Sequence, residues 1–136
     1  SIMMSPRRAQ RTVPADKSVA VGRLTKAQSF LSVADEALDL ADNENDVADA
    51  AVTLYVHAGI AAADAICAAA LGLHAKGSDH AQAVTLLAEV DKPASRQLST
   101  LIGMKTRAGY GHDPMNSDQL RRARRAAQSL VNRART

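Results

Sequence analysis

The chain has 136 residues, the length of one domain, and its net charge at neutral pH is +3. Alanine accounts for 28 residues, about a fifth of the chain, which favours helices. Only three residues are aromatic, so a β-sandwich or β-barrel is excluded, because those folds use far more aromatic and β-branched side chains. The single cysteine, Cys67, excludes an internal disulfide framework and a cysteine-rich zinc site.

The first residues are expected to form a tail. Residues 1–21 contain two prolines and scattered bases with little periodicity, which predicts a flexible basic tail before a helical domain at 22–136. No secretory signal is visible at the start, and the apolar stretch Ala58–Leu73 is broken by Asp64 and is short for a membrane span. We therefore expect a cytoplasmic protein with no membrane partner.

Two long helices are predicted in the first half. Apolar residues at steps of three and four predict a helix from an N-cap at Thr25 to about Asp42. Asp46 is the expected N-cap of a second helix, Val47 to about Leu73, with Gly77 as the residue that ends it. This second helix is apolar nearly all round after Ala58, so we expect it at the centre of the protein.

Three more helices are predicted in the second half. A short one, capped by Ser78 or Asp79, runs to about Val90, and the next runs from Pro93 to about Ala108. The last, capped by Asn116 or Ser117, runs to about Arg133. The predicted fold is all-α, an antiparallel bundle of four main helices plus one short helix. Because few large apolar residues are available for its core, we expect a homodimer.

Charge is divided unevenly along the chain. Residues 27–75 contain eight carboxylates and no Lys or Arg, whereas residues 92–136 contain ten bases and two carboxylates. This asymmetry predicts either a basic surface that binds phosphates or two halves of opposite charge that face each other within the bundle.

Catalytic signatures are scarce. The chain has no His-Glu-x-x-His helix, no phosphate-cradling glycine loop and no nucleophile elbow, and Cys67 is typical of a small buried hydrophobic residue. His57 is expected to be structural or exposed, and His74 and His80 lack a third metal ligand nearby. The exception is the stretch from Lys105 to His112, where two bases, Tyr110 and an imidazole meet a glycine-rich turn.

In this stretch the sequence resembles the HEPN superfamily, whose members are small α-helical bundles that dimerise. Many of them carry an Arg followed after four to six residues by a His, at the end of the helix before the last. Here Arg107 and His112 are separated by four residues at that position. The resemblance covers about Leu24 to Ala134 and is closest to an alanine-rich branch with the string Arg-x-Gly-Tyr-Gly-His.

The resemblance implies an RNA-binding protein, with a metal-independent endoribonuclease of the toxin or defence type as the expected activity. It implies catalytic roles for Arg107 and His112, no cofactor, and an antitoxin protein as a possible partner. His112 would move a proton, Arg107 would hold the phosphate, and Lys105 and Tyr110 would bind or orient the substrate.

Two positions depart from the family pattern. Active HEPN ribonucleases often have a polar residue directly after the Arg, where this chain has Ala108. One toxin branch has a Tyr two residues after the His, where this chain has Pro114. Ala108 favours the alternative of a non-catalytic HEPN dimer that binds a partner protein or a nucleotide. A DNA-binding helical module is a third option, supported only by the arginine-rich last helix.

Asp64 is the one carboxylate in the apolar half of the second helix. A buried carboxylate without a partner is costly, so we expect a partner for it. The functional hypothesis is that Asp64 orients Lys105, Arg107, Tyr110 or His112, and the alternative is that it faces solvent.

Overall fold

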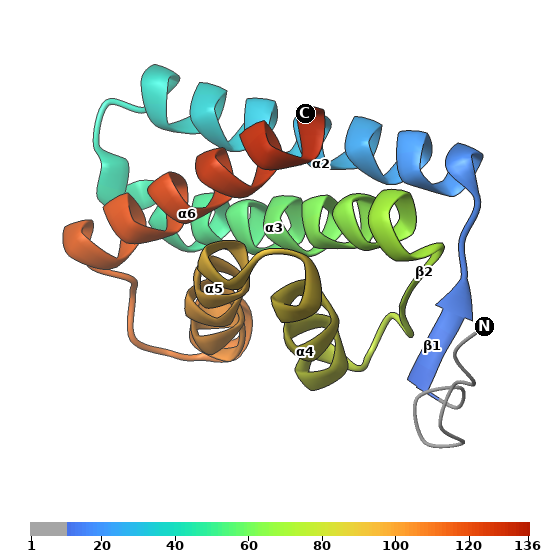
Figure 1. Ribbon diagram of the computed structural model, residues 1–136. Helices are drawn as coiled ribbons and strands as arrows, with labels where there is room; N and C mark the ends of the chain where they lie inside the picture. The colour runs from blue at the N-terminus through green and yellow to red at the C-terminus, as the bar shows by residue number, and fades with distance from the viewer. Residues whose placement is uncertain (1–10) are drawn as a thin grey trace.

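The computed structural model describes residues 11–136, which form an all-α bundle of five α-helices and a small two-stranded sheet (Figure 1). The elements in chain order are β1 (Thr12–Pro14), α2 (Lys17–Leu40), the 3₁₀ turn η1 (Glu44–Asp46), α3 (Ala48–Leu71), β2 (Leu73–Ala75), α4 (His80–Val90), α5 (Lys92–Tyr110) and α6 (Ser117–Arg135). This confirms the predicted all-α bundle with one short helix, α4.

Figure 1 shows how the helices are arranged. Helices α2 and α3 run antiparallel, and α6 lies beside both of them. Helices α4 and α5 form a second antiparallel pair that crosses α3. The central position of α3 confirms the prediction, because this helix packs against all four others.

Close packing around α3 depends on small residues. Its buried positions are mostly alanines, and a Cβ at Gly59 would collide with Leu101 of α5 and come within 3.3 Å of Leu130 of α6. Absence of a side chain at this position therefore lets α5 and α6 approach α3. By length and hydropathy α3 alone, among the described helices, passes as a membrane span, but 61% of its most apolar window is buried inside the protein. Such burial is typical of the core helix of a soluble protein.

Helix α2 begins nine residues earlier than the sequence predicted. The side chain of Asp16 caps it by accepting a hydrogen bond from the N–H of Val19 at 3.0 Å. The predicted N-cap at Thr25 is wrong, because Thr25 lies inside the helix and its hydroxyl donates to the carbonyl of Val21. An Asp ahead of the helix accepts an orphan N–H, whereas a Thr in the helix interior only bonds the preceding turn.

The second helix has the predicted extent within two residues, but both of its predicted capping residues are wrong. Asp46 belongs to η1, and α3 starts after Val47 without a side-chain cap. The helix ends at Gly72, whose φ of 70° is left-handed, and not at Gly77. Gly72 reverses the chain at once into β2, a turn that a residue with a Cβ makes at a cost.

The sequence did not predict the two short strands. β1 pairs antiparallel with β2, with Thr12 opposite Ala75 and Pro14 opposite Leu73. Arg11 adds a two-pronged contact to Asp79, donating from Nε at 2.6 Å and from a terminal nitrogen at 2.9 Å. The expected tail thus supplies a strand and the start of α2, while its residues 1–10 lie outside the described residues.

The predicted caps of α4 and α6 are confirmed, and α5 begins one residue before the predicted Pro93. Asp79 caps α4 and Asp91 caps α5, each accepting from a backbone N–H at 3.0 Å. Asn116 caps α6 and forms a reciprocal capping box with Gln119. These acidic and amide side chains satisfy the first N–H groups of each helix, which have no partner inside it.

Candidate nucleic-acid interface

Arg107 and His112 lie where α5 ends and the chain turns toward α6. Arg107 is exposed in the last turn of α5, and His112 is 97% exposed in the following loop. His112 Nε2 lies 3.6 Å from a carboxylate oxygen of Asp113. Within the described part of the chain, Arg107 and His112 form no hydrogen bond with each other. They are therefore accessible to a large ligand.

The glycines of this turn have a local role. The N–H of Gly111 donates to the carbonyls of Thr106 and Arg107, each at 3.2 Å, and closes α5. A Cβ at Gly111 would lie 2.9 Å from the Arg107 carbonyl oxygen, so a larger residue would disturb the backbone that carries Arg107. Ala108, by contrast, is buried against the core.

Lys105 and Tyr110 are not close partners of one another. Tyr110 is 84% exposed and lies on the surface. Lys105 is half-buried and faces the region of His80 at the start of α4. Burial lowers the pKa of His80, and Lys105 lowers it further, while Asp64 and Asp79 oppose this shift.

Asp64 is buried, at 7% exposure, and it has the partner that the sequence analysis expected. That partner is Arg23 of α2, whose guanidinium approaches one carboxylate oxygen at 2.9 and 3.1 Å. None of the four partners considered from the sequence forms a hydrogen bond with it. Burial raises the pKa of Asp64, and the charges of Arg23, His74 and His80 offset part of that rise.

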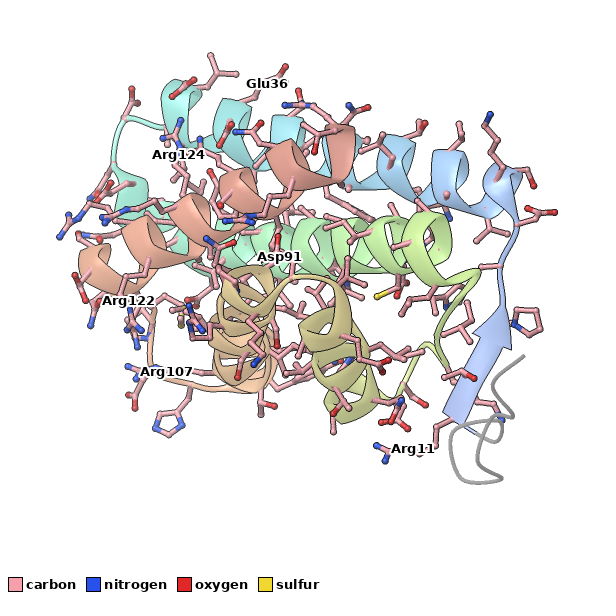
Figure 2. All side chains as sticks on the ribbon, in the orientation of Figure 1. Arg11, Glu36, Asp91, Arg107, Arg122 and Arg124 are labelled. Carbon is pink, nitrogen blue, oxygen red and sulfur yellow. The ribbon has the colours of Figure 1, made fainter. Side chains whose placement is uncertain are left out.

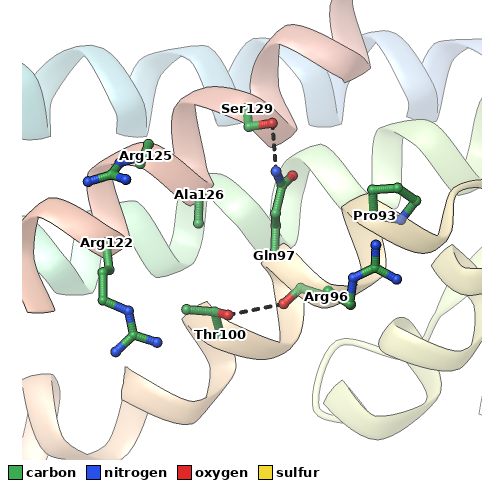
Figure 3. Close-up of a pocket in the computed structure, with 8 residues that line it drawn as sticks. All are labelled: Pro93, Arg96, Gln97, Thr100, Arg122, Arg125, Ala126 and Ser129. Atoms are coloured by element: carbon green, nitrogen blue, oxygen red, sulfur yellow. Dashed lines mark hydrogen bonds between the residues drawn. The ribbon is translucent and has the colours of Figure 1, made fainter.

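A pocket of about 580 Å³ lies between α5 and α6 (Figure 3). Helix α5 contributes Pro93, Arg96, Gln97 and Thr100, and helix α6 contributes Arg122, Arg125, Ala126 and Ser129. Gln97 and Ser129 meet in its middle, where Gln97 Nε2 donates to Ser129 Oγ at 2.8 Å. Three guanidinium groups and no carboxylate line this pocket, so it suits an anion.

The pocket and Arg107 belong to one side of the molecule. Arg96, Thr100, Gly103 and Arg107 follow one another at helical steps of four, three and four, which places them on one face of α5. Figure 2 shows Arg107 and Arg122 at the same end of the bundle, with Arg124 on the α2 side of α6. A basic surface thus runs from the pocket to the end of α5. We call it the α5–α6 basic surface, defined by Arg96, Arg107, Arg122 and Arg125.

Sequence reasoning missed the pocket. A signal for it existed, since on each helix the four lining residues have the spacing i, i+3, i+4, i+7 and include arginine. That spacing marks one face of a helix, but it does not tell which other helix the face meets. From the sequence, the arginines of α6 were identified only as part of a basic surface for phosphates or of a DNA-binding module.

The remaining candidates have ordinary surroundings. His57 is exposed and its ring lies 5.5 Å from that of Phe30. His74 Nδ1 lies 2.7 Å from the carbonyl oxygen of Ala75. Cys67 is buried, as expected. In residues 11–136 no cluster of three or more His, Cys, Asp or Glu side chains is arranged to hold a metal ion.

No protein-family model matches this chain, and no curated protein matches its sequence. The function of this chain is therefore inferred from its residues and their arrangement.

Proposed function

We propose that this protein is an RNA-binding, HEPN-like helical protein that cleaves RNA without a metal ion at Arg107 and His112. The observation that supports it is the continuity of the α5–α6 basic surface with the turn that carries both residues. A strand bound by its phosphates along this surface passes Arg107 and reaches the exposed imidazole of His112.

The chemistry uses the nucleophile that RNA itself carries. His112 takes the proton of a 2′-hydroxyl, and the O2′ atom attacks the adjacent phosphorus. The bond from phosphorus to the 5′-oxygen breaks, and this oxygen receives a proton from a second imidazole. Arg107 binds the phosphate oxygens and stabilises the charge that develops on them. The products are a 2′,3′-cyclic phosphate and a 5′-hydroxyl end.

This scheme needs one imidazole as base and another as acid. A homodimer with two-fold symmetry supplies both, because it brings two copies of the same turn to one groove. The proposal therefore includes a homodimer, a cytoplasmic setting and, for a toxin, an antitoxin protein as partner.

The test is incubation of labelled total tRNA and one structured RNA with the protein in EDTA. Arg107→Ala and His112→Ala are the test variants, and His57→Ala and Arg121→Ala are controls that alter exposed residues outside the turn. Cleavage with cyclic-phosphate ends by the wild type and both controls, and by neither test variant, is the expected result. Equal cleavage by all five proteins would contradict the assignment of the site.

A second candidate is a non-catalytic module that binds a partner protein or a nucleotide. The observation that favours it is Ala108, a buried apolar residue directly after Arg107, where active HEPN ribonucleases often have a polar one. No cleavage by any version, with every version folded and dimeric by sedimentation, would favour this candidate. RNA affinity that persists in Arg107→Ala would support it further.

A further inference from the structure

The pocket between α5 and α6 has an excess of positive charge. Arg96, Arg122 and Arg125 line it, and their guanidinium groups form no hydrogen bond or ion pair within residues 11–136. The carboxylate next to this region is Asp91, whose pKa is lowered mainly by its hydrogen bond from the N–H of Ala94 and further by the charges of Arg133 and Arg96. Both oxygens of Asp91 are already engaged, one with Ala94 and the other with Arg133.

Four other arginines among residues 11–136 differ in this respect. Arg11, Arg23, Arg124 and Arg133 each lie against a carboxylate. The pocket is therefore lined by three exposed arginines whose guanidinium donors are available to an anion. Guanidinium forks match phosphate oxygens in geometry as well as in charge.

Polar side chains in the middle of the pocket provide further hydrogen-bonding groups for a ligand. Ser129 Oγ accepts a hydrogen bond from Gln97, so its own proton is free to be donated to an anion. The other amide atom, Gln97 Oε1, is buried and accepts no hydrogen bond within the described residues. The last torsion of a glutamine is broad, so a small rotation turns this acceptor toward a donor on a bound molecule.

The charge of the pocket distinguishes between kinds of phosphate. A phosphodiester inside a strand carries one negative charge, whereas a terminal phosphate carries about −1.5 to −2 at neutral pH. Three unpaired guanidinium groups are balanced better by the terminal group. A pocket of about 580 Å³ also has room for the sugar or base that follows this phosphate, beside Gln97.

We propose that the α5–α6 pocket is a binding site for a terminal phosphate, a phosphomonoester, and that RNA strands ending in phosphate are its ligands. RNA as the carrier of this phosphate rests on the proposed function, whereas the phosphate site itself does not. A free nucleotide offers the same chemistry, so the experiment separates these two sources.

The experiment compares two 2′-O-methyl RNA oligonucleotides of one sequence, one with a 5′-phosphate and one with a 5′-hydroxyl. These strands lack the 2′-hydroxyl nucleophile, so cleavage does not disturb the measurement of affinity. The wild type is expected to bind the phosphorylated strand about tenfold more tightly, the effect of one or two charge-assisted hydrogen bonds. This preference should decrease between pH 7 and pH 5, as the phosphate gains its second proton.

The double variant Arg122→Gln/Arg125→Gln is expected to bind both strands equally. Arg121→Gln removes a charge from the same helix outside the pocket, and this control should keep the preference. Thermal unfolding of all three proteins confirms that they are folded. A wild type with no preference, or a double variant that keeps it, would overturn the proposal.

Titration with 5′-AMP, adenosine and inorganic phosphate distinguishes recognition of the phosphate from recognition of the molecule that carries it. Binding of 5′-AMP but not adenosine, lost in the double variant, with no affinity for either strand, would support the phosphate site and contradict RNA as its ligand. Gln97→Met is expected to weaken binding of 5′-AMP while leaving that of inorganic phosphate unchanged. Loss of both would show that Gln97 only shapes the pocket, which would contradict its assigned contact.

Discussion

Neighbouring arginines on α6 have opposite surroundings. Toward α2, Arg124 Nε lies 3.2 Å from Asp35, and the same carboxylate oxygen accepts a hydrogen bond at 2.6 Å from the buried hydroxyl of Tyr55. Toward α5, Arg125 lines a pocket without a carboxylate. An arginine therefore forms an ion pair between helices where a carboxylate faces it. Where no carboxylate faces it, its guanidinium group remains available to a ligand.

The α2 side contains several such contacts between helices because residues 27–75 supply the carboxylates. Asp35 connects α2 to α3 and α6, and Asp64 connects α3 to the start of α2. Burial and the bond to Asp35 raise the pKa of Tyr55 well above its ordinary value. On the α5–α6 side both helices come from the basic part of the chain. The uneven charge noted in the sequence therefore has two structural results: opposite charges pair between α2 and α6, and a basic surface remains over α5 and α6.

The largest expected effect is on the α2 side. Arg23→Gln leaves the buried carboxylate of Asp64 without its cation, and we expect the free energy of unfolding to fall by about 2 kcal/mol at neutral pH. Because the pKa of Asp64 is raised in the folded state, its protonated form is favoured there, so the loss should be smaller near pH 4. Urea unfolding at both pH values measures this.

A second substitution provides the control for Arg23→Gln. Adding Asp64→Asn removes the unpaired charge, and the double variant should regain most of the lost stability. RNA affinity should remain unchanged in both proteins. An equal loss of stability in the single and double variants would show that Arg23 acts through packing and not through charge.

Next in size is a substitution beneath the pocket. Gly59→Ala forces Leu101 and Leu130 apart at the contact of α3 with α5 and α6, and about 1–2 kcal/mol of stability should be lost. RNA affinity should fall as well, because these two helices form the pocket. Gly103→Ala in α5 is the matched control, since its Cβ meets no atom within 4 Å, and it should be neutral or slightly stabilising. Destabilisation by both would point to helix bending instead of packing.

The comparison of the two sides of α6 is tested directly by replacing Arg124 and Arg125 one at a time. Arg124→Gln should lower the free energy of unfolding by about 1 kcal/mol and leave RNA affinity intact, because Arg124 is partly exposed and paired with Asp35. Arg125→Gln should change stability by less than about 0.5 kcal/mol and weaken RNA binding. Denaturant melts and filter binding measure the two effects. The distinction between the two sides of α6 fails if both variants behave alike.

The smallest expected effect concerns the contact of Arg11, just before β1, with Asp79, the cap of α4. Hydrogen bonds from Arg11 and from the N–H of Gln82 lower the pKa of Asp79 to about 2. A lowered pKa in the folded state gives stability that is present above the unfolded value of about 4 and is lost as the pH falls toward 2. Asp79→Asn should therefore flatten the decline of stability between pH 4 and pH 2. Asp118→Asn, at an exposed carboxylate 4.0 Å from Arg121, should follow the wild type.

Much of the fold was predictable because it is local. The periodicity of apolar residues indicated each helix, and the caps of α4 and α6 lie where the sequence placed them. The pair of strands was not predictable, because three-residue strands carry little signal and β1 meets β2 across some sixty residues of chain. The role of Gly72 was not predictable either, because its left-handed conformation is required only by the strand that follows it.

The candidate site was likewise predictable only in part. Arg107 and His112 were identified from a spacing along the chain, and the structure leaves both exposed at the end of α5. The pocket needed two helix faces to meet, and Asp64 needed a partner from a helix whose start the sequence misplaced. Contacts between elements depend on helix packing angles, which no single segment encodes.

The sequence by itself determined the helical class, the central place of α3 and the excess of basic residues in the last third of the chain, because propensity, periodicity and charge are properties of short segments. Only the tertiary structure decided which arginines face a carboxylate. This follows from packing, since Arg124 and Arg125 are adjacent in the chain but about 100° apart around the helix, and so face different neighbours.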